Sequence, residues 1–338
     1  MPERADRMGA AWLLGIEIGG TKLQLGIGQG GGELAALLRR PVDPSRGAAG
    51  ILDQIESGLP DLIRQAGLTG QPIRSIGVGF GGPVDAAQGR IERSYQVPGW
   101  EGFPLADWLR DRFAVPAVVV HNDADTAGLA EARFGAGRGC SPLLYLTVGS
   151  GIGGALLIEG RIYRGFGQGA GEIGHLHVPD GSGPVPGWLE LEQVASGWAI
   201  AQAAQDHARR LIEHRATDWI LLERAAHDPD RIHAAMVAQA AGEGDAASAS
   251  ILARAHAAVA FALVQAIALL APRRIVLGGG VSLIGEAGWF DPIRRLVDRQ
   301  VFPPFRGGFD IVPAVLREEV VVHGALTLAH EALPPAER

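Results

Sequence analysis

The sequence of 338 residues has one cysteine, Cys140, and one lysine, Lys22, among its 30 basic residues. A single thiol can form neither an internal disulfide nor a multi-cysteine zinc site, so we expect a reducing compartment, the cytoplasm. Every other basic residue is arginine. Chance alone can leave a single lysine. Because lysine is a compact point charge whereas arginine is a wide planar fork, its place beside a glycine turn also suggests a chemical role for Lys22.

Long apolar runs and basic stripes are also missing. The longest apolar run, residues 257–271, is shorter than the roughly 20 residues that cross a bilayer, so it predicts a buried helix and no membrane contact. The short run of residues 10–14 follows Arg4 and Arg7 and leads into a glycine turn, which does not fit a signal peptide. With a net charge of −7 and no basic stripe, we expect no nucleic-acid partner.

Glycine, by contrast, is abundant: the chain has 49, about twice the usual frequency of ~7%. Glycines gather in three turns, each directly after an apolar strand, at residues 19–21, 149–151 and 278–280. Backbone N–H groups at such turns can point inward and hold phosphate oxygens, although a single turn of this kind is equally well explained as a tight hairpin. None of the three fits the P-loop or the dinucleotide-binding pattern.

Apolar strands alternate with helical segments, which predicts an α/β fold with a mixed sheet in each half. A strand, a glycine turn and a second strand occupy residues 12–27, and the same pattern returns at residues 143–158, which suggests an internal duplication. Further strands are expected at residues 73–80, 117–120 and 274–277, and helices at residues 48–66, 124–134, most of 199–271, 282 onward and 318–332.

The length suggests about two domains. We expect a small N-terminal α/β domain of residues 1–118 and a larger α/β domain of residues 119–317. A C-terminal helix of about residues 318–338 is expected to pack back on the first domain. The ligand cleft is expected between the two domains, where such sites commonly form.

Two short segments suit a small polar ligand. Asn122 and Asp123 lie where a strand leads into a helix; Asp123 or Asp125 could cap that helix, and a carboxylate that faces a ligand could act as a general base. Glu172 and His175 lie three residues apart in a glycine-rich loop, where they could hydrogen-bond a ligand or serve the structure alone.

Seven segments, in order along the chain, resemble the ROK family (repressor, open reading frame, kinase) of sugar kinases, within the superfamily of actin, Hsp70 and hexokinase. They are residues 17–22, 79–85, 97–100, 122–125, 147–154, 171–175 and 278–280. Residues 17–22, Glu-Ile-Gly-Gly-Thr-Lys, resemble the family's first phosphate motif, and residues 171–175 resemble its Gly-Glu-x-Gly-His. The resemblance implies a two-domain actin-like ATPase (ribonuclease H-like) fold.

The resemblance also implies ATP-dependent phosphorylation of a hexose hydroxyl with Asp123 as the base, and Mg²⁺ that bridges the phosphates and reaches Glu17 through water. The Pro-Gly-Trp of residues 98–100 favours glucose as the hexose. The implied sugar-binding residues are Gly82, Asn122, Asp123, Glu172, His175 and Glu192. The implied ATP-binding residues are Gly19, Gly20, Thr21, Lys22, Thr147, Gly149, Ser150, Gly151, Gly279 and Gly280. A homodimer is expected on the same ground.

The chain departs from the family pattern at three places. Glu17 stands where the family has aspartate, which keeps the charge and adds one methylene, and Asp125 replaces an asparagine and is assigned to the helix cap. The family's zinc-binding cysteines after His175 are missing, so we expect no zinc. Their loss leaves the next family glutamate open between Glu190 and Glu192. Glu192 fits better, because Leu-Glu then precedes Val-Ala-Ser-Gly.

Alternatives to a glucokinase stay open. The hexose could be fructose, mannose, N-acetylglucosamine or N-acetylmannosamine, and polyphosphate could replace ATP as the donor. A non-catalytic sugar-binding regulator on the same fold would account for Glu17 and for the missing cysteines. An Hsp70-like or actin-like ATPase with a protein partner is disfavoured by Glu172 and His175, which suit a small polyol.

Overall fold

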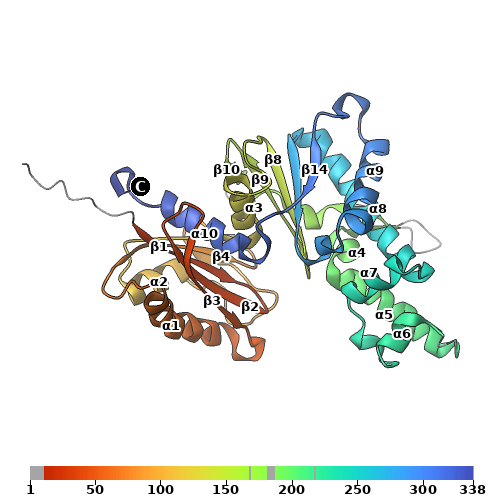
Figure 1. Ribbon diagram of the computed structural model, residues 1–338, viewed down its shortest axis with the longest axis horizontal. Helices are drawn as coiled ribbons and strands as arrows, with labels where there is room; N and C mark the ends of the chain where they lie inside the picture. The colour runs from red at the N-terminus through yellow and green to blue at the C-terminus, as the bar shows by residue number, and fades with distance from the viewer. Residues whose placement is uncertain (1–10, 167–168, 181–186, 217, 338) are drawn as a thin grey trace, which may run out of the picture. The chain divides into compact units, whose positions relative to one another are not determined.

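The structure, a computed structural model, describes residues 11–166, 169–180, 187–216 and 218–337. Its contacts divide the chain into two compact units, and most of their elements are labelled in Figure 1. Unit 1 comprises Met1–Phe134, Arg164–Gln168 and Glu318–Arg338. Unit 2 comprises Gly135–Tyr163 and Gly169–Arg317.

The sheet of unit 1 has five strands in the order β3-β2-β1-β4-β7. Their bounds are β1 Trp12–Ile18, β2 Lys22–Gly28, β3 Leu34–Pro41, β4 Ile73–Phe80 and β7 Ala117–Asn122. β1 and β2 form an antiparallel hairpin around the first glycine turn, and β4 and β7 join in parallel. β3 is not among the predicted strands, because it is an edge strand whose apolar residues run into Arg39 and Arg40.

Helices and short strands complete unit 1. Their bounds are α1 Gly47–Gln65, β5 Val84–Asp85, β6 Arg90–Ile91, α2 Leu105–Phe113, α3 Asp123–Arg133 and α10 Val320–Glu331. Ile55 of α1 and Leu109 of α2 are fully buried in one core with Ile16 and Val78 of the sheet. The apolar positions of the strands and of these two helices therefore form the common core of this unit.

Helix α10 lies against β1, β4 and α3 (Figure 1). A Cβ atom on Gly77 of β4 would lie 1.9 Å from the carbonyl oxygen of Ala325. A Cβ atom on Gly324 of α10 would lie 1.9 Å from the carbonyl oxygen of Thr126 in α3. This close approach is possible because glycine has no side chain at either position.

The two units divide after Phe134, beyond the boundary expected at residue 118. β7 completes the sheet of unit 1 by pairing with β4, and α3, which follows β7 directly, packs against α10. Asn122 and Asp123 therefore belong to unit 1.

The sheet of unit 2 repeats the arrangement of the first, in the order β10-β9-β8-β13-β14. Its strands are β8 Leu143–Val148, β9 Ile152–Ile158, β10 Arg161–Ile162, β13 Arg274–Gly278 and β14 Asp310–Pro313. β8 and β9 form an antiparallel hairpin around the second glycine turn, and β13 and β14 join in parallel. The prediction of a mixed sheet in each half is confirmed, and the shared strand order fits the suggested duplication.

The rest of unit 2 is mostly helical. The bounds are β11 His177–Asp180, β12 Gly187–Glu190, α4 Glu192–Ala195, α5 Gly197–Glu213, α6 Ile220–Arg224, α7 Ala234–Gly242, α8 Ala246–Leu270 and α9 Asp291–Gln300. By length and composition α8 could cross a membrane, but more than half of its most apolar stretch is buried inside the protein. Val259 and Leu263 of α8 are fully buried in the core of unit 2, as the sequence predicts for this run.

The helix expected from Ser282 onward begins later. A 3₁₀ turn covers Gly280–Ile284, a π-helical turn covers Glu286–Phe290, and only then does α9 follow. Gly285, between the two turns, has a φ of +89°, which a continuous helix does not allow.

Candidate active site

The first glycine turn joins β1 to β2 in unit 1. Gly19 donates its backbone N–H to the carbonyl oxygen of Lys22 over 2.9 Å, and the carbonyl oxygen of Thr21 accepts a hydrogen bond from the chain after β3. A Cβ on Gly20 would overlap the side chain of Gln96, 1.6 Å from its Oε1. Sequence reasoning misses Gln96; its one signal is its place directly before the Val-Pro-Gly-Trp segment.

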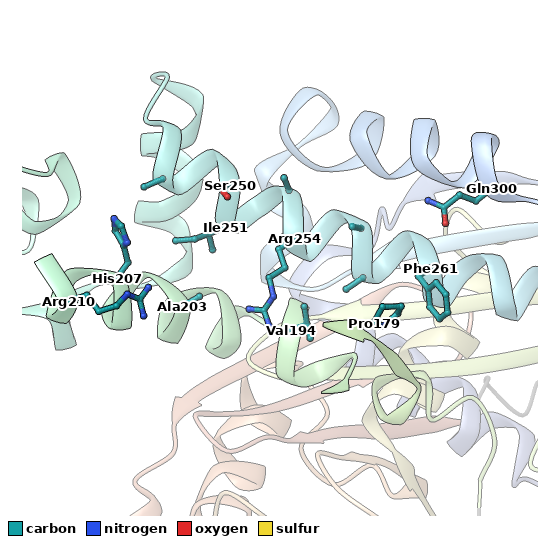
Figure 2. Close-up of a pocket in the computed structure, with 14 residues that line it drawn as sticks. Pro179, Val194, Ala203, His207, Arg210, Ser250, Ile251, Arg254, Phe261 and Gln300 are labelled. Atoms are coloured by element: carbon teal, nitrogen blue, oxygen red, sulfur yellow. The ribbon is translucent and has the colours of Figure 1, made fainter. Parts of the chain in front are cut away.

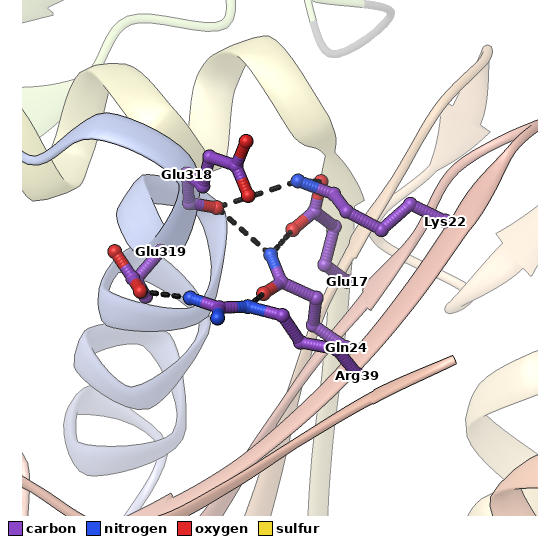
Figure 3. A network of polar contacts seen from close by, with 6 residues as sticks. All are labelled: Glu17, Lys22, Gln24, Arg39, Glu318 and Glu319. Carbon is purple, nitrogen blue, oxygen red and sulfur yellow. Dashed lines mark hydrogen bonds and ion pairs between the residues drawn. The ribbon is translucent and has the colours of Figure 1, made fainter. Parts of the chain in front are cut away.

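Glu17 and Lys22 face each other beside this turn (Figure 3). Glu17 Oε1 lies 3.3 Å from Lys22 Nζ, and the two side chains are 12% and 35% exposed. Gln24 donates through Nε2 to Glu17 Oε2 and, over 2.8 Å, to the carbonyl oxygen of Glu318. Burial raises the pKa of Glu17, while the charge of Lys22 and the hydrogen bond from Gln24 oppose the rise. Lys22 therefore limits how far burial favours the neutral carboxyl group.

The network continues to the start of α10. Arg39 of β3 donates Nε–H to Gln24 Oε1 over 2.8 Å and forms an ion pair with Glu319 (Figure 3). Glu17 and Gln24 are cross-strand partners in the hairpin, so their contact follows from the register of β1 and β2. The bond from Gln24 to Glu318 joins residues 294 positions apart, which no local pattern predicts.

Asn122 is the N-cap of α3. Its Oδ1 accepts hydrogen bonds from the backbone N–H groups of Ala124 at 2.8 Å and Asp125 at 3.3 Å. Its Nδ2 donates to the carbonyl oxygen of Gly82 over 3.1 Å. The assignment of the cap to Asp125 is therefore wrong: Asn122 has the extended backbone that a cap requires, whereas Asp125 lies within the first helical turn and is 7% exposed.

Asp123 is the first residue of α3. Its Oδ1 accepts a hydrogen bond from the backbone N–H of Ala124 over 2.8 Å. A Cβ on Gly81 would lie 3.4 Å from Asp123 Oδ2, so the carboxylate lies beside the turn of Gly81 and Gly82. Gly81 in turn donates its N–H to the carbonyl oxygen of Ile18, at the end of β1, over 2.9 Å. Unit 1 thus brings together the predicted base, the predicted sugar-side glycine and the first glycine turn.

The second glycine turn joins β8 to β9 in unit 2. Gly149 donates its N–H to the carbonyl oxygen of Gly151 over 2.9 Å. Gly197, the first residue of α5, donates to the carbonyl oxygen of Gly149 over 2.7 Å, and Trp198 donates to that of Ser150 over 3.3 Å. The turn is therefore held against the N-terminus of α5.

Glu192 lies against this second turn. Its Oε2 accepts a hydrogen bond from the backbone N–H of Ile152 over 2.7 Å, and a Cβ on Gly151 would lie 2.4 Å from the same oxygen. Glu190 contacts a different group: its Oε2 lies 3.1 Å from Nδ1 of His175. The two glutamates that the sequence leaves open therefore have separate partners.

The third glycine turn follows β13 and lies beside the second. Gly278 pairs with Thr147 in the parallel ladder of β13 and β8. Gly279 has a φ of +84°, and a Cβ on it would lie 2.5 Å from the carbonyl carbon of Val148, so only glycine fits. A Cβ on Gly280 would meet no described atom within 4 Å. Thr147 and the two predicted ATP-binding glycines therefore lie in one region of unit 2.

Glu172 directly precedes a short 3₁₀ turn, Ile173–His175, and His175 is the last residue of that turn. A Cβ on Gly174 would lie 2.2 Å from the carbonyl oxygen of Ile152, so the turn packs tightly against the start of β9. His175 donates its backbone N–H to the carbonyl oxygen of Glu172 over 3.1 Å. The Gly-Glu-x-Gly-His segment thus lies next to the second glycine turn.

A sequence model of the ROK family matches residues 13–332. The chain belongs to the ROK family. It is 31% identical over 324 residues to a glucokinase of Halalkalibacterium halodurans, with 94% of each chain covered. It is 29% identical over 330 residues to a glucokinase of Thermotoga maritima, and the match covers 95% of this chain and 98% of the relative.

Among solved structures, this ROK-family chain is similar to a ROK family glucokinase from Streptomyces griseus in complex with glucose and AMPPNP. The TM-score is 0.76 at 29% identity, with 95% of this chain and 100% of the other covered. The predicted family and the predicted fold class are confirmed.

The hairpin of β11 and β12 follows His175, in the segment where the resemblance leads one to expect zinc-binding cysteines and this chain has none. Residues 181–186, between the two strands, lie outside the described residues. Asp180 forms an ion pair with Arg254 of α8 over 2.9 Å, and the ring of Trp188 packs edge-on against Phe261 of α8. Within the described part of the chain, no group of three or more His, Cys, Asp or Glu residues could hold a metal ion. The absence of zinc stays a prediction.

A separate pocket of about 780 Å³ lies in unit 2 between α5 and α8 (Figure 2). His207 and Arg210 of α5 and Arg254 and Phe261 of α8 are among its lining residues. Its described lining includes none of the predicted sugar-binding or ATP-binding residues. In this ROK-family chain the pocket and the predicted site residues are therefore distinct features.

Proposed function

We propose that this protein transfers the γ-phosphoryl group of ATP to a hydroxyl group of a hexose, with glucose as substrate and glucose 6-phosphate as product. The observation that carries the proposal lies within unit 1: Asp123 lies beside the turn of Gly81 and Gly82, which is hydrogen-bonded to the end of β1 at the first glycine turn. A base for the hydroxyl and a backbone cradle for phosphate must be neighbours in such a transfer. The similarity to glucokinases supports the proposal.

In this proposal Asp123 accepts the proton of the attacking sugar hydroxyl. The hydroxyl oxygen forms a bond to the γ-phosphorus while the bond between the γ-phosphorus and the ADP oxygen breaks. Asp123 Oδ1 is held by the N–H of Ala124, and Asn122 holds the start of α3, so the carboxylate is positioned before substrate binds. Phosphoryl transfer depends on positioning and on electrostatic stabilisation more than on covalent chemistry by the protein.

The sugar is proposed to contact the side chains and backbone groups predicted from the sequence. These residues are Gly82, Asn122, Asp123, Glu172, His175 and Glu192. The carboxylates in this set accept hydrogen bonds, whereas the amide of Asn122 both donates and accepts. Polar groups placed to match particular hydroxyls reject sugars that lack them, because a buried polar group is then left unpaired.

The nucleotide is proposed to bind the three glycine turns. In this proposal the nucleoside lies against Gly279 and Gly280. The residues that contact the phosphates are Gly19, Gly20, Thr21, Lys22, Thr147, Gly149, Ser150 and Gly151. The partly exposed Lys22 Nζ supplies positive charge for the phosphates. The open space at Gly280 supports a role in contact with a ligand.

Mg²⁺ is proposed to accompany ATP and to reach Glu17 through water. Both oxygens of this largely buried carboxylate already meet donors, Lys22 Nζ and Gln24 Nε2. These residues fit a contact through water, because Mg²⁺ keeps several waters and is usually bound by one or two carboxylates plus substrate phosphates. When bound, the ion neutralises charge on the phosphates. Mg²⁺ and the homodimer stay predictions.

The test is ADP release with ATP and Mg²⁺ across glucose, fructose, mannose, N-acetylglucosamine and N-acetylmannosamine. Formation of the hexose phosphate is the readout when polyphosphate replaces ATP as the donor. We expect turnover on glucose, and we expect Asp123→Asn to lower kcat at least about 100-fold, the usual scale of a general base. Asp107→Asn, at an exposed position of α2 in the same unit, is the control and should keep native turnover.

The outcomes separate the alternatives. Strong turnover on another hexose would keep the kinase and change its substrate. No hexose-dependent ADP release from the folded native chain would point to a sugar-binding regulator. Full activity of Asp123→Asn would remove Asp123 as the base.

A further inference from the structure

The side chains of His175 and Glu190 meet in unit 2. Nδ1 of His175 lies 3.1 Å from Oε2 of Glu190. The histidine side chain is still 64% exposed and the glutamate 35%, so the contact leaves much of the imidazole ring open to a ligand. Glu190 belongs to neither the sugar-binding nor the ATP-binding set proposed above.

The backbone holds both residues of this pair. His175 ends the 3₁₀ turn that packs against β9, and Glu190 ends β12 and is the cross-strand partner of His177. The residues that follow are also joined, because Leu191 donates its N–H to the carbonyl oxygen of Leu176 over 2.8 Å. The fold therefore fixes the backbone positions of both residues of the pair.

The hairpin that carries Glu190 is itself fixed on α8. The ion pair of Asp180 with Arg254 holds one strand, and the ring contact of Trp188 with Phe261 holds the other. Glu190 thus approaches His175 from an anchored strand, which suits a residue that must hold another side chain in one orientation.

The chemistry of the pair sets the position of a proton. A carboxylate accepts hydrogen bonds and donates none, so a neutral imidazole beside it carries its proton on the nearer nitrogen. Glu190 therefore selects the tautomer of His175 that has Nδ1–H and a lone pair on Nε2. We propose that Glu190 is a positioning residue that fixes this tautomer and the ring orientation, so that His175 Nε2 accepts a hydrogen bond from a hexose hydroxyl. The inference rests on the proposed function and adds to it the direction of one hydrogen bond.

Nitrogen-15 NMR of the histidine side chains reads the tautomer directly in the full chain. At pH 8.5 we expect His175 to carry Nδ1–H, with its signals assigned by their loss in His175→Asn. Glu190→Ala should release the ring to a mixture that contains the Nε2–H form. Glu190→Gln keeps an acceptor oxygen but adds an amide donor, so it should retain Nδ1–H in part, between the native chain and Glu190→Ala.

Hexose binding gives the second readout. Glu190→Ala should raise the Kd and the KM for the hexose about 10-fold, the scale of one hydrogen bond, with kcat changed less than about 3-fold and the KM for ATP unchanged. Glu190→Gln should recover part of the affinity, in proportion to the Nδ1–H form that it retains. Glu213→Ala, at an exposed position of α5 in the same unit, is the matched control.

Two results would overturn the inference: an Nε2–H tautomer in the native chain, or a Glu190→Ala variant that binds the hexose as the native chain does. Failure of the proposed function is read separately, as no hexose-dependent ADP release from the native chain. In that case the calorimetric Kd for the hexose still decides the inference, and a native chain that binds no hexose overturns both.

Discussion

Oε2 of Glu192 accepts a hydrogen bond from the backbone N–H of Ile152 over 2.7 Å. Ile152 begins β9 directly after the second glycine turn, and a Cβ on Gly151 would lie 2.4 Å from the same carboxylate oxygen. A carboxylate proposed for the sugar and a turn proposed for the phosphates thus hold each other in place. A substitution in the second glycine turn should therefore displace the carboxylate of Glu192, and the loss of this carboxylate should loosen the turn.

Replacing Gly151 by alanine should displace Glu192, because the new Cβ would collide with Oε2. We expect kcat/KM for the hexose to fall roughly 10- to 100-fold, since a small misplacement of a positioning group is costly. The control is Gly242→Ala at the end of α7, where a Cβ would meet no described atom within 4 Å. Native kcat/KM in Gly151→Ala would show that the hydrogen bond to Ile152 does not matter for the reaction.

Replacing Lys22 by methionine separates a role in phosphate binding from a role in the network around Glu17. We expect kcat/KM for ATP to fall about 100-fold, the scale of one lost charge-stabilising donor. Arg39→Met, which breaks the same network at Gln24 and Glu319, should change kcat/KM less than about 3-fold, because such partly exposed ion pairs contribute little. Equal losses in both variants would assign Lys22 to the network alone.

Gly279 and Gly280 should respond differently to alanine. Gly279→Ala should lower the free energy of unfolding by about 1 to 3 kcal/mol or more, because its backbone has a φ of +84° and a Cβ would collide with Val148. Gly280→Ala should change stability by less than about 0.5 kcal/mol but raise the KM for ATP. Urea unfolding and steady-state kinetics measure the two effects. An unchanged KM in Gly280→Ala would place the nucleoside elsewhere.

His121 should make the stability depend on pH. Burial, and to a smaller extent the charge of Arg164, lower the pKa of His121 from 6.5 to about 4. As the pH falls below 6.5 the unfolded chain binds a proton that the folded chain does not bind until about pH 4. This contribution to stability is therefore complete above pH 6.5 and is lost toward pH 4, by about 3 kcal/mol.

The measurement is the free energy of urea unfolding at pH 7 and about pH 4.5. In His121→Gln the loss of stability between these values should be smaller than in the native chain by about 2 to 3 kcal/mol. His214→Gln, exposed at the end of α5, should leave the loss unchanged. The same pH dependence in His121→Gln and in the native chain would contradict a neutral, buried His121.

The parts of the candidate site that could be predicted from the sequence are those encoded by residues close together in the chain. The glycine turns were predictable because an apolar strand and the glycines that end it are neighbours in the chain. Asn122 and Asp123 were predictable as the junction of a strand with a helix. The cap was assigned wrongly because Asn122, Asp123 and Asp125 are all suitable capping residues, and only the backbone angles show which one precedes the first turn.

The sequence by itself determined the inner strands of both sheets, the glycine turns, the repeated pattern of strand, turn and strand, and the family, because periodicity and turn geometry are properties of short segments. Only the tertiary structure decided that Gln96 lies over Gly20, that the backbone of Glu318 joins the network of Glu17, and that His175 pairs with Glu190. These contacts join residues that are not adjacent in the chain. They depend on how whole strands and helices pack within each unit, which no short segment encodes.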